Sequence, residues 1–210
     1  MSAENVTSLR PIWEEANAFQ IHVVLEGIEP SIWRRLIVPM KITLAEFHHI
    51  LQAAMGWTNS HLHKFEIGGL SYGDSHILNM DISENSPLTF DSTAVHLRDF
   101  RFYYGEGPSF VYEYDFGDSW RHIITLEKLL TVKPAPKTSQ CVEGARCCPP
   151  EAHSYAEFLR VLLAPEPGEI EEQKHLTSWS GGKFDPELFE LAKTDKAVRG
   201  ALRKRQRKSD

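Results

Sequence analysis

Residues 110–126 read FVYEYDFGDSWRHIITL, and this stretch predicts a β-hairpin. On either side of the turn-forming pair Gly117-Asp118, every second residue is aromatic or aliphatic, which is the period of a strand with one buried face. We expect two sets of side chains, one on each strand, to share a face: Phe110, Tyr112, Tyr114 and Phe116, then Trp120, His122, Ile124 and Leu126. Aromatic cross-strand pairs stabilise hairpins and fill a core, so the stretch favours an antiparallel sheet.

The first quarter of the chain predicts another hairpin followed by a helix. Apolar residues alternate over 19–25, the run EGIEPS favours a turn, and IWRRLIV over 32–38 is expected to be a second strand. Thr43 and Glu46 have the spacing of a capping box, and apolar residues follow at helical spacing until a glycine ends the run. We therefore expect a helix over 44–55 and a β-β-α first half of β-grasp type.

The middle of the chain gives weaker signals. Residues 62–67 alternate before Gly68-Gly69, which indicates a strand and a tight turn. Residues 73–99 favour a long irregular connection with one short strand. Residues 133–152 favour a proline-containing loop that holds the cysteines.

The last third predicts helices. Ser154 begins a capping-box pattern, a second helix is expected over 168–179, and Asp185-Pro186 is a helix start with Asp as N-cap and Pro at the first helical position. Strands followed by helices, without alternating strand-helix units, predict an α+β fold with a mostly antiparallel sheet and C-terminal helices.

Composition bounds the class of protein. With 210 residues, of which 41% are apolar, the chain is long enough for one domain with a substantial core. The sequence has no secretory pattern and no window near the roughly 20 apolar residues of a membrane span. Three cysteines do not make the disulfide framework of a secreted miniprotein. We therefore expect a cytoplasmic protein without membrane contact.

The formal charge of −6 is unevenly distributed. Residues 199–210 hold six Lys or Arg and one Asp, a net charge of +5 that leaves −11 for the rest. A net-acidic body does not favour extended contact with DNA phosphates. Nucleic-acid contact is therefore expected only through the basic C-terminal tail, and a solvated tail without such a role is the alternative.

Several motifs in the same order resemble the plasmid pRiA4b ORF-3-like family: PSIWRRLIVP, AAMGWTNSHLHKFEI, YEYDFGDSWRHIITLEK, and CVEGARCCPPE followed by SYAEFL. The resemblance spans about Phe19 to Phe189. It implies a compact α+β domain of bacteria and archaea, often encoded near plasmid or mobile-element genes, and it implies no demonstrated activity. We expect an N-terminal extension over 1–18, a single domain over 19–195 and the basic tail over 196–210.

A cysteine-rich run is the first candidate for chemistry. Cys141, Cys147, Cys148 and His153 lie within 13 residues, and thiolate plus imidazole is a ligand set of structural zinc. The spacing lacks the paired two-residue separation of a zinc knuckle, so we expect these cysteines to act as small buried apolar side chains. The alternative is zinc at Cys141 and Cys148, with His153 or a distant histidine as a further ligand.

A set of imidazoles and carboxylates is the second candidate: His61, His63, Asp115, Asp118 and His122. Two histidines two residues apart would share one face of a strand, and carboxylates are hard metal ligands or general bases. Together with Trp120 they form our candidate ligand-binding site, in which we expect His61, His63 and both aspartates to face one cleft near the cysteine loop.

Structural roles are the favoured interpretation of the two aspartates. Asp118 lies in the predicted turn, where its carboxylate can cap its own backbone. Asp115 can pair with Arg121 or Arg34.

A set of Trp and Arg residues is the third candidate, because these residue types are enriched in binding surfaces: Trp33, Arg34, Arg35, Trp57 and Trp120. Core packing accounts for most Trp residues, so we expect at least two of these to be buried. The function that we expect is a non-catalytic binding or regulatory module. The rivals are a metal-dependent hydrolase of nucleic acid or a phosphoester, using the histidines and aspartates, and a DNA-associated accessory factor.

Overall fold

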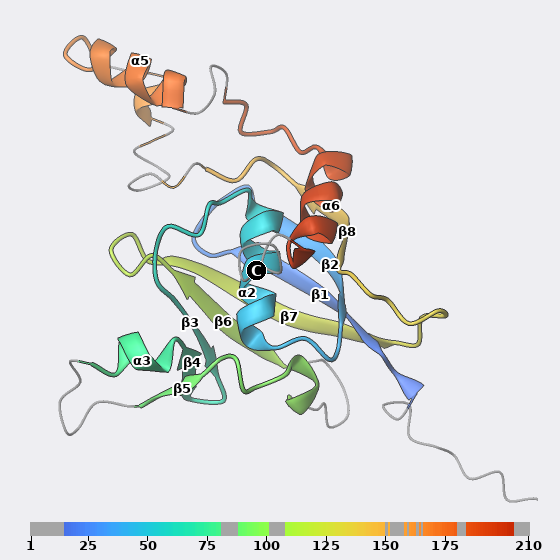
Figure 1. Cartoon of the computed structure of the whole chain (residues 1–210). Coiled ribbons are helices and arrows are strands. Elements are labelled where there is room, and N and C mark those ends of the chain that lie inside the picture. Colours follow the sequence, from blue (N-terminus) through green and yellow to red (C-terminus); the bar gives the residue numbers. More distant parts are fainter. Residues whose placement is uncertain are drawn as a thin grey trace, which may run out of the picture.

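The computed structural model describes residues 15–80, 88–100, 108–149, 151, 158, 160–162, 164, 166–179 and 184–203. Within these residues one eight-stranded sheet forms, in the order β5-β4-β3-β6-β7-β1-β2-β8 (Figure 1). The strands are β1 (Ala18–Leu25), β2 (Trp33–Pro39), β3 (His63–Ile67), β4 (Leu70–Gly73), β5 (Thr89–Asp91), β6 (Ser109–Tyr114), β7 (Trp120–Leu130) and β8 (Gln140–Ala145). Only the pairing of β4 with β5 is parallel, which confirms the α+β class with a mostly antiparallel sheet.

The first half has the expected β-β-α order. β1 and β2 pair antiparallel, and α2 (Leu44–Met55) follows with the bounds that the sequence predicts. The capping box is present, because the Glu46 amide donates to Thr43 Oγ1 at 3.1 Å and the Thr43 amide donates to Glu46 Oε2 at 2.9 Å. Gly56 ends the helix at φ 85°, a left-handed conformation that favours glycine. The likeness to a β-grasp stays a prediction.

The hairpin predicted over 110–126 is confirmed. β6 pairs with β7 so that Tyr112 lies opposite His122 and Tyr114 opposite Trp120. All four of these side chains are buried. The prediction for Phe116 is wrong, because the strand ends at Tyr114 and the Phe116 side chain stands in the turn, 42% exposed.

Two local predictions are also wrong. The region expected to be a cysteine loop contains β8, which pairs with the edge of β2. Asp185-Pro186 forms a turn, and the last helix, α6, begins later and spans Leu191–Gly200. Residue 195, the expected end of the domain, lies inside α6, and Val198 of this helix is buried in the core.

Two other local predictions are confirmed. The predicted helix over 168–179 is present as α5 (Ile170–Trp179). The connection over 73–99 has the expected short strand, together with α3 (Ser75–Leu78) and a 3-10 turn, η1 (Leu97–Asp99). The capping-box residues Ser154 and Glu157 lie outside the described residues.

The core lies between α2 and one face of the sheet, with α6 beside α2 (Figure 1). The large side chains that fill it come from α2 and five strands: Phe19, Ile21, Leu36, Phe47, Phe65, Tyr112 and Leu126. The other face of the central strands is half-buried and carries ion pairs, such as Arg35 with Glu127 at 2.9 Å. In the part of the chain that the structure describes, no helix has both the length and the apolar composition to cross a membrane.

Candidate functional site

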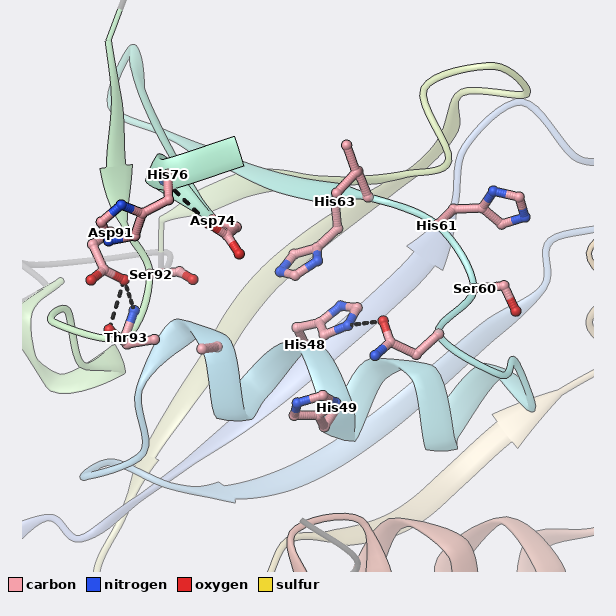
Figure 2. Close-up of a pocket in the computed structure, with 13 residues that line it drawn as sticks. His48, His49, Ser60, His61, His63, Asp74, His76, Asp91, Ser92 and Thr93 are labelled. Carbon is pink, nitrogen blue, oxygen red and sulfur yellow. Dashed lines mark hydrogen bonds between the residues drawn. The ribbon is translucent and has the colours of Figure 1, made fainter. Parts of the chain in front are cut away.

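A pocket of about 630 Å³ opens beside α2, between the segment that leads into β3 and the α3–β5 region. Five histidines line this pocket, which we call the histidine pocket: His48, His49, His61, His63 and His76 (Figure 2). The carboxylates of Asp74 and Asp91 line it as well. Its volume lies within the range of small-molecule sites in proteins.

A closed ring of hydrogen bonds fixes the deepest of these histidines. The backbone N–H of Asn59 donates to Gln52 Oε1 at 2.9 Å. The side-chain NH₂ of Gln52 is therefore the group that donates to the Tyr112 hydroxyl, at 3.0 Å. The hydroxyl proton then goes to His48 Nδ1, 2.7 Å away. His48 Nε2 must therefore carry a hydrogen, which it donates to Asn59 Oδ1 at 2.6 Å. Both nitrogens of His48 are used and its tautomer is set.

His63 stacks face to face on His48, with ring centroids 3.5 Å apart and an interplanar angle of 3° (Figure 2). Burial, with repulsion from His63, lowers the pKa of His48 to about 2. Burial, with repulsion from His49, lowers the pKa of His63 to about 4. Both rings are thus neutral at pH 7. The Nε2 atom of His63 is buried and has no hydrogen-bond partner among the described residues.

Next to the pocket lies a second arrangement, which we call the His61 cluster: His61, Asp115 and Glu151. His61 Nε2 lies 3.4 Å from Asp115 Oδ2 and 3.8 Å from Glu151 Oε2. The His61 ring points away from His48 and His63, so the cluster and the stacked histidines do not share one centre (Figure 2). The cluster joins three segments: the loop before β3, the turn of the β6–β7 hairpin and the end of the cysteine region.

Hydrogen bonds hold both carboxylates of the His61 cluster, Asp115 through Oδ1 and Glu151 through both oxygens. Asp115 Oδ1 accepts from the Gly117 amide at 3.0 Å. Glu151 Oε1 accepts from the Thr58 amide and from the Thr58 hydroxyl. The other oxygen of each carboxylate, Asp115 Oδ2 and Glu151 Oε2, is the one that faces His61.

Tyr114 connects the cluster to the core. Its hydroxyl accepts from the Ser60 and His61 amides at 2.8 and 3.2 Å and donates to Glu151 Oε2 at 3.1 Å. Burial, followed by the nearby Glu151 charge, raises the pKa of Tyr114 to about 12, so the hydroxyl keeps its proton. The Trp57 ring stacks on Tyr114 with centroids 5.3 Å apart. This packing holds the loop before β3 in place.

The structure places the sequence-predicted site residues in different surroundings. His61 and Asp115 come together as expected. His63 stacks on His48 instead, and Asp115 and Asp118 are not among the residues that line the histidine pocket; one cleft shared by both histidines and both aspartates stays a prediction. Asp118 lies in the hairpin turn. The physical reason is that His61 precedes β3, whose first residue is His63, so the two-residue rule for a strand face does not apply to this pair.

Trp120 and His122 belong to the core rather than to a surface. Trp120 is 6% exposed and His122 is 0% exposed, and both rings pack against Trp57. His122 Nδ1 donates to the Trp120 carbonyl at 3.1 Å, whereas His122 Nε2 and Trp120 Nε1 are buried without a partner among the described residues. Burial lowers the pKa of His122 to about 4. A ligand-binding role for these two residues stays a prediction.

The cysteines lie near the buried guanidinium of Arg34. Cys141, Cys147 and Cys148 are free, and burial raises the pKa of Cys141 to about 11 and that of Cys148 further. His153 lies outside the described residues, so zinc at Cys141, Cys148 and His153 stays a prediction. Within the described ranges, no group of three His, Cys, Asp or Glu side chains could hold a metal ion.

The proposed Trp and Arg surface does not form as a set. Trp57, Trp120 and Arg34 are buried. Trp33 and Arg35 lie on the half-buried face of the sheet, with the Arg35 guanidinium 5.3 Å from the Trp33 ring centroid.

Sequence reasoning missed His48, Asn59, Tyr114 and Glu151 as site residues. His48 had a signal, because it lies four residues after Leu44, on the same face of the predicted helix as the apolar stripe. Glu151 also had a signal in the sequence, because it is the last residue of the motif CVEGARCCPPE. Tyr114 acts through partners distant in the chain, Ser60, His61 and Glu151, which local patterns do not reveal. Asn59 bonds to His48 and Gln52 on the preceding helix, through a loop conformation that local patterns do not reveal.

Comparison with known proteins gives a consistent family and fold. The model of the family described as plasmid pRiA4b ORF-3-like protein matches residues 17–193. The uncharacterised protein y4hQ of Sinorhizobium fredii (strain NBRC 101917 / NGR234) is 33% identical over 201 residues, covering 92% of this chain and 97% of the relative. The crystal structure of MM3350, a protein of unknown function from Methanosarcina mazei Go1, superposes with a TM-score of 0.68 at 30% identity, covering 85% of this chain and 96% of the other.

Proposed function

Because this chain belongs to the plasmid pRiA4b ORF-3-like family, whose relatives above carry no stated activity, we propose a function from the geometry of its pocket. The protein is a non-catalytic binding module. The histidine pocket takes a small ligand that is neutral or positively charged and donates hydrogen bonds.

The observation that carries this proposal is the unpartnered Nε2 atom of His63. A buried polar atom without a hydrogen bond costs free energy, about 1–3 kcal/mol, so such atoms are rare and point to a missing partner. The neighbouring His48 has both nitrogens satisfied. His63 therefore has a hydrogen-bonding position that no described residue fills, beside a His48 ring whose two nitrogens are both hydrogen-bonded.

The charge of the pocket selects the ligand class. Two aspartates and no Lys or Arg are among the residues that line it. The hydrogen bonds that hold the aspartates use Oδ1 of each, from the His76 and Ile77 amides to Asp74 and from Thr93 to Asp91. As far as the described residues go, Oδ2 of each carboxylate accepts no hydrogen bond and can accept one from a ligand. Neutral imidazoles beside carboxylates disfavour phosphate and carboxylate ligands.

Binding fits the pocket better than catalysis. A general base works best when its pKa lies near the operating pH. The pKa values of His48 and His63, lowered by burial to about 2 and about 4, lie well below neutrality. In addition, both nitrogens of His48 are committed to the ring of hydrogen bonds.

The rival functions rest on other parts of the chain. A DNA-associated role depends on the basic tail, of which residues 204–210 lie outside the described residues. A hydrolase of the expected kind would need a metal beside an activated water, and among the described residues no group of three His, Cys, Asp or Glu could hold a metal ion.

The test is a thermal-shift experiment on the full chain with matched probes. Spermidine and ribose represent the cationic and the neutral donor-bearing class, and citrate represents the anionic class, all at one ionic strength. We expect spermidine or ribose to raise the melting temperature and citrate not to, because ligand binding to the folded state stabilises it.

Two variants and one control locate the effect. His63→Phe keeps the stacked ring but removes Nε2, and Asp74→Asn keeps the N-cap of α3 but removes the charge. The first should abolish the response, and the second should weaken the response to spermidine most. His175→Phe, on the exposed surface of α5, should respond as the wild type does. A response to citrate alone, an undiminished response in His63→Phe, or no response to either donor-bearing probe would contradict the proposal.

A further inference from the structure

We propose that Trp120 and His122 form a buried binding site for one small neutral molecule that carries a hydroxyl group. The two residues stand two positions apart in β7, and their buried side chains share one face of the strand. Neither side chain lines the histidine pocket. The site is therefore separate from that pocket and does not depend on the function proposed for it.

The hydrogen bonds of His122 decide what its second ring nitrogen can do. His122 Nδ1 lies 3.1 Å from the Trp120 carbonyl oxygen and 3.4 Å from the Tyr112 carbonyl oxygen. A carbonyl oxygen only accepts, so Nδ1 must carry a hydrogen. Burial lowers the pKa of His122 to about 4, so at pH 7 the ring is neutral and has no other ring N–H. Nε2 is therefore a lone pair, which accepts a hydrogen bond and cannot donate one.

The indole nitrogen of Trp120 has the opposite requirement, because an indole N–H only donates. Both Trp120 Nε1 and His122 Nε2 are buried, and neither has a hydrogen-bond partner among the described residues. The donor on one ring thus does not bond directly to the acceptor on the other. Buried polar groups without a partner are rare. Two of opposite kind on neighbouring side chains point to one group that serves both.

A hydroxyl group meets both requirements at once. Its oxygen accepts the hydrogen of Trp120 Nε1, and its own hydrogen goes to His122 Nε2. A carboxylate or a carbonyl group only accepts, and an ammonium group only donates, so none of these satisfies both nitrogens. A charged ligand would in addition lose its hydration in the core without an opposite charge to replace it. The chemistry of the two rings therefore selects a neutral hydroxyl.

The packing around the two rings keeps the bound molecule small. The Trp57 ring contacts both, with its centroid 5.6 Å from that of Trp120 and 5.2 Å from that of His122. Residues two apart on a strand are about 7 Å apart, so one oxygen between their side chains can lie about 3 Å from each nitrogen. Water is the smallest molecule with this chemistry, and buried waters typically join such polar groups. Methanol carries the same hydroxyl and is slightly larger.

NMR of the ¹⁵N-labelled full chain tests the proposal, with water as the first probe. The indole proton of Trp120, identified by its loss in Trp120→Phe, should give a cross-peak with water. A bound water inverts the sign of this cross-peak between nuclear Overhauser and rotating-frame spectra, whereas hydrogen exchange does not. We expect the inversion at Trp120. The ¹⁵N resonance of His122 Nε2 should lie upfield of that of a free lone pair, since it accepts a hydrogen bond.

Variants assign the bound molecule to the two rings. His122→Phe keeps an aromatic ring but removes the acceptor, so the Trp120 cross-peak with water should be lost. Tyr72→Phe, in β4 and away from both rings, is the matched control and should keep it. Circular dichroism checks the fold, and should His122→Phe not fold, the His122 Nε2 resonance of the wild type still decides.

A methanol titration distinguishes the two sources of the hydroxyl. A sign-inverting water cross-peak with no response to methanol supports the site with water as its occupant. Saturable shifts of the Trp120 indole and His122 Nε2 resonances with methanol support the site with an alcohol as its occupant. Neither signal, or a His122 Nε2 resonance at the position of a free lone pair, overturns the proposal. A water cross-peak that His122→Phe keeps at full strength overturns it as well, because His122 then does not hold the water.

Discussion

Tyr112→Phe is the substitution that tests the ring of hydrogen bonds behind the histidine pocket. It removes a single oxygen atom from a fully buried side chain and keeps the aromatic ring that packs against Phe65 and His122. That oxygen accepts from Gln52 and donates to His48. Without it, the NH₂ group of Gln52 and the Nδ1 lone pair of His48 each lose a partner in the core.

The expected loss follows from these two orphaned groups. A buried donor or acceptor left without a partner costs about 1–3 kcal/mol. Two such groups, after some relaxation, should lower the free energy of unfolding by about 3 kcal/mol. With a urea m-value of about 3 kcal/mol per molar, the unfolding midpoint should fall by about 1 M.

Urea unfolding followed by Trp fluorescence measures this loss. Tyr72→Phe is the matched control, because the Tyr72 hydroxyl makes no hydrogen bond with any described residue, and we expect it to stay within about 0.5 kcal/mol of wild type. A double-mutant cycle with His48→Phe should give a coupling energy of about 1 kcal/mol or more. If Tyr112→Phe is as stable as Tyr72→Phe and the cycle shows no coupling, the ring of hydrogen bonds does not hold His48 as argued.

Two further predictions concern the core. Trp120→Ala should lower the free energy of unfolding by about 3–5 kcal/mol, since the side chain is buried against Trp57. Phe116→Ala in the same hairpin, where the ring is exposed, should lower it by less than about 1 kcal/mol. Equal losses in the two variants would refute the assignment of Trp120 to the core. Burial lowers the pKa values of His48, His63 and His122 to about 2, 4 and 4 from an ordinary value of 6.5. Below about pH 6.5 the unfolded chain therefore binds more protons than the folded chain, and the free energy of unfolding should fall as the pH drops to about 4. The slope is at most about 4 kcal/mol per pH unit for three protons. Urea midpoints measured across this range should show the fall, with a shallower slope in His63→Phe; a flat profile would mean that these rings are solvated.

Local signals were sufficient for the elements that local interactions define. The helix over 44–55 was predicted to the residue because its capping box, its apolar stripe and its terminal glycine are all written in neighbouring positions. The two hairpins followed from alternation around short turns. β8 was not predicted, because its strand character comes from pairing with β2, about 100 residues earlier in the chain, and Cys141 is the only buried residue in it.

In the candidate site, too, contacts within the predicted sheet could be foreseen and long-range contacts could not. His61 and Asp115 were placed together correctly, since the strand after His61 pairs with the strand before Asp115. Glu151 was missed as their partner because a long-range contact brings it to the cluster. His63 was assigned to the aspartates, although burial favours a neutral ring stacked on His48 over a charged partner.

The most direct test of the central claim, that the histidine pocket binds a donor-bearing ligand through His63, is imidazole ¹⁵N NMR during titration with spermidine. The Nε2 resonance of His63 should shift and reach saturation. The resonances of His122, which is buried outside the pocket, should stay unchanged, and His48 should keep its hydrogen on Nε2. A His63 signal that does not move at spermidine concentrations that stabilise the protein would contradict the claim.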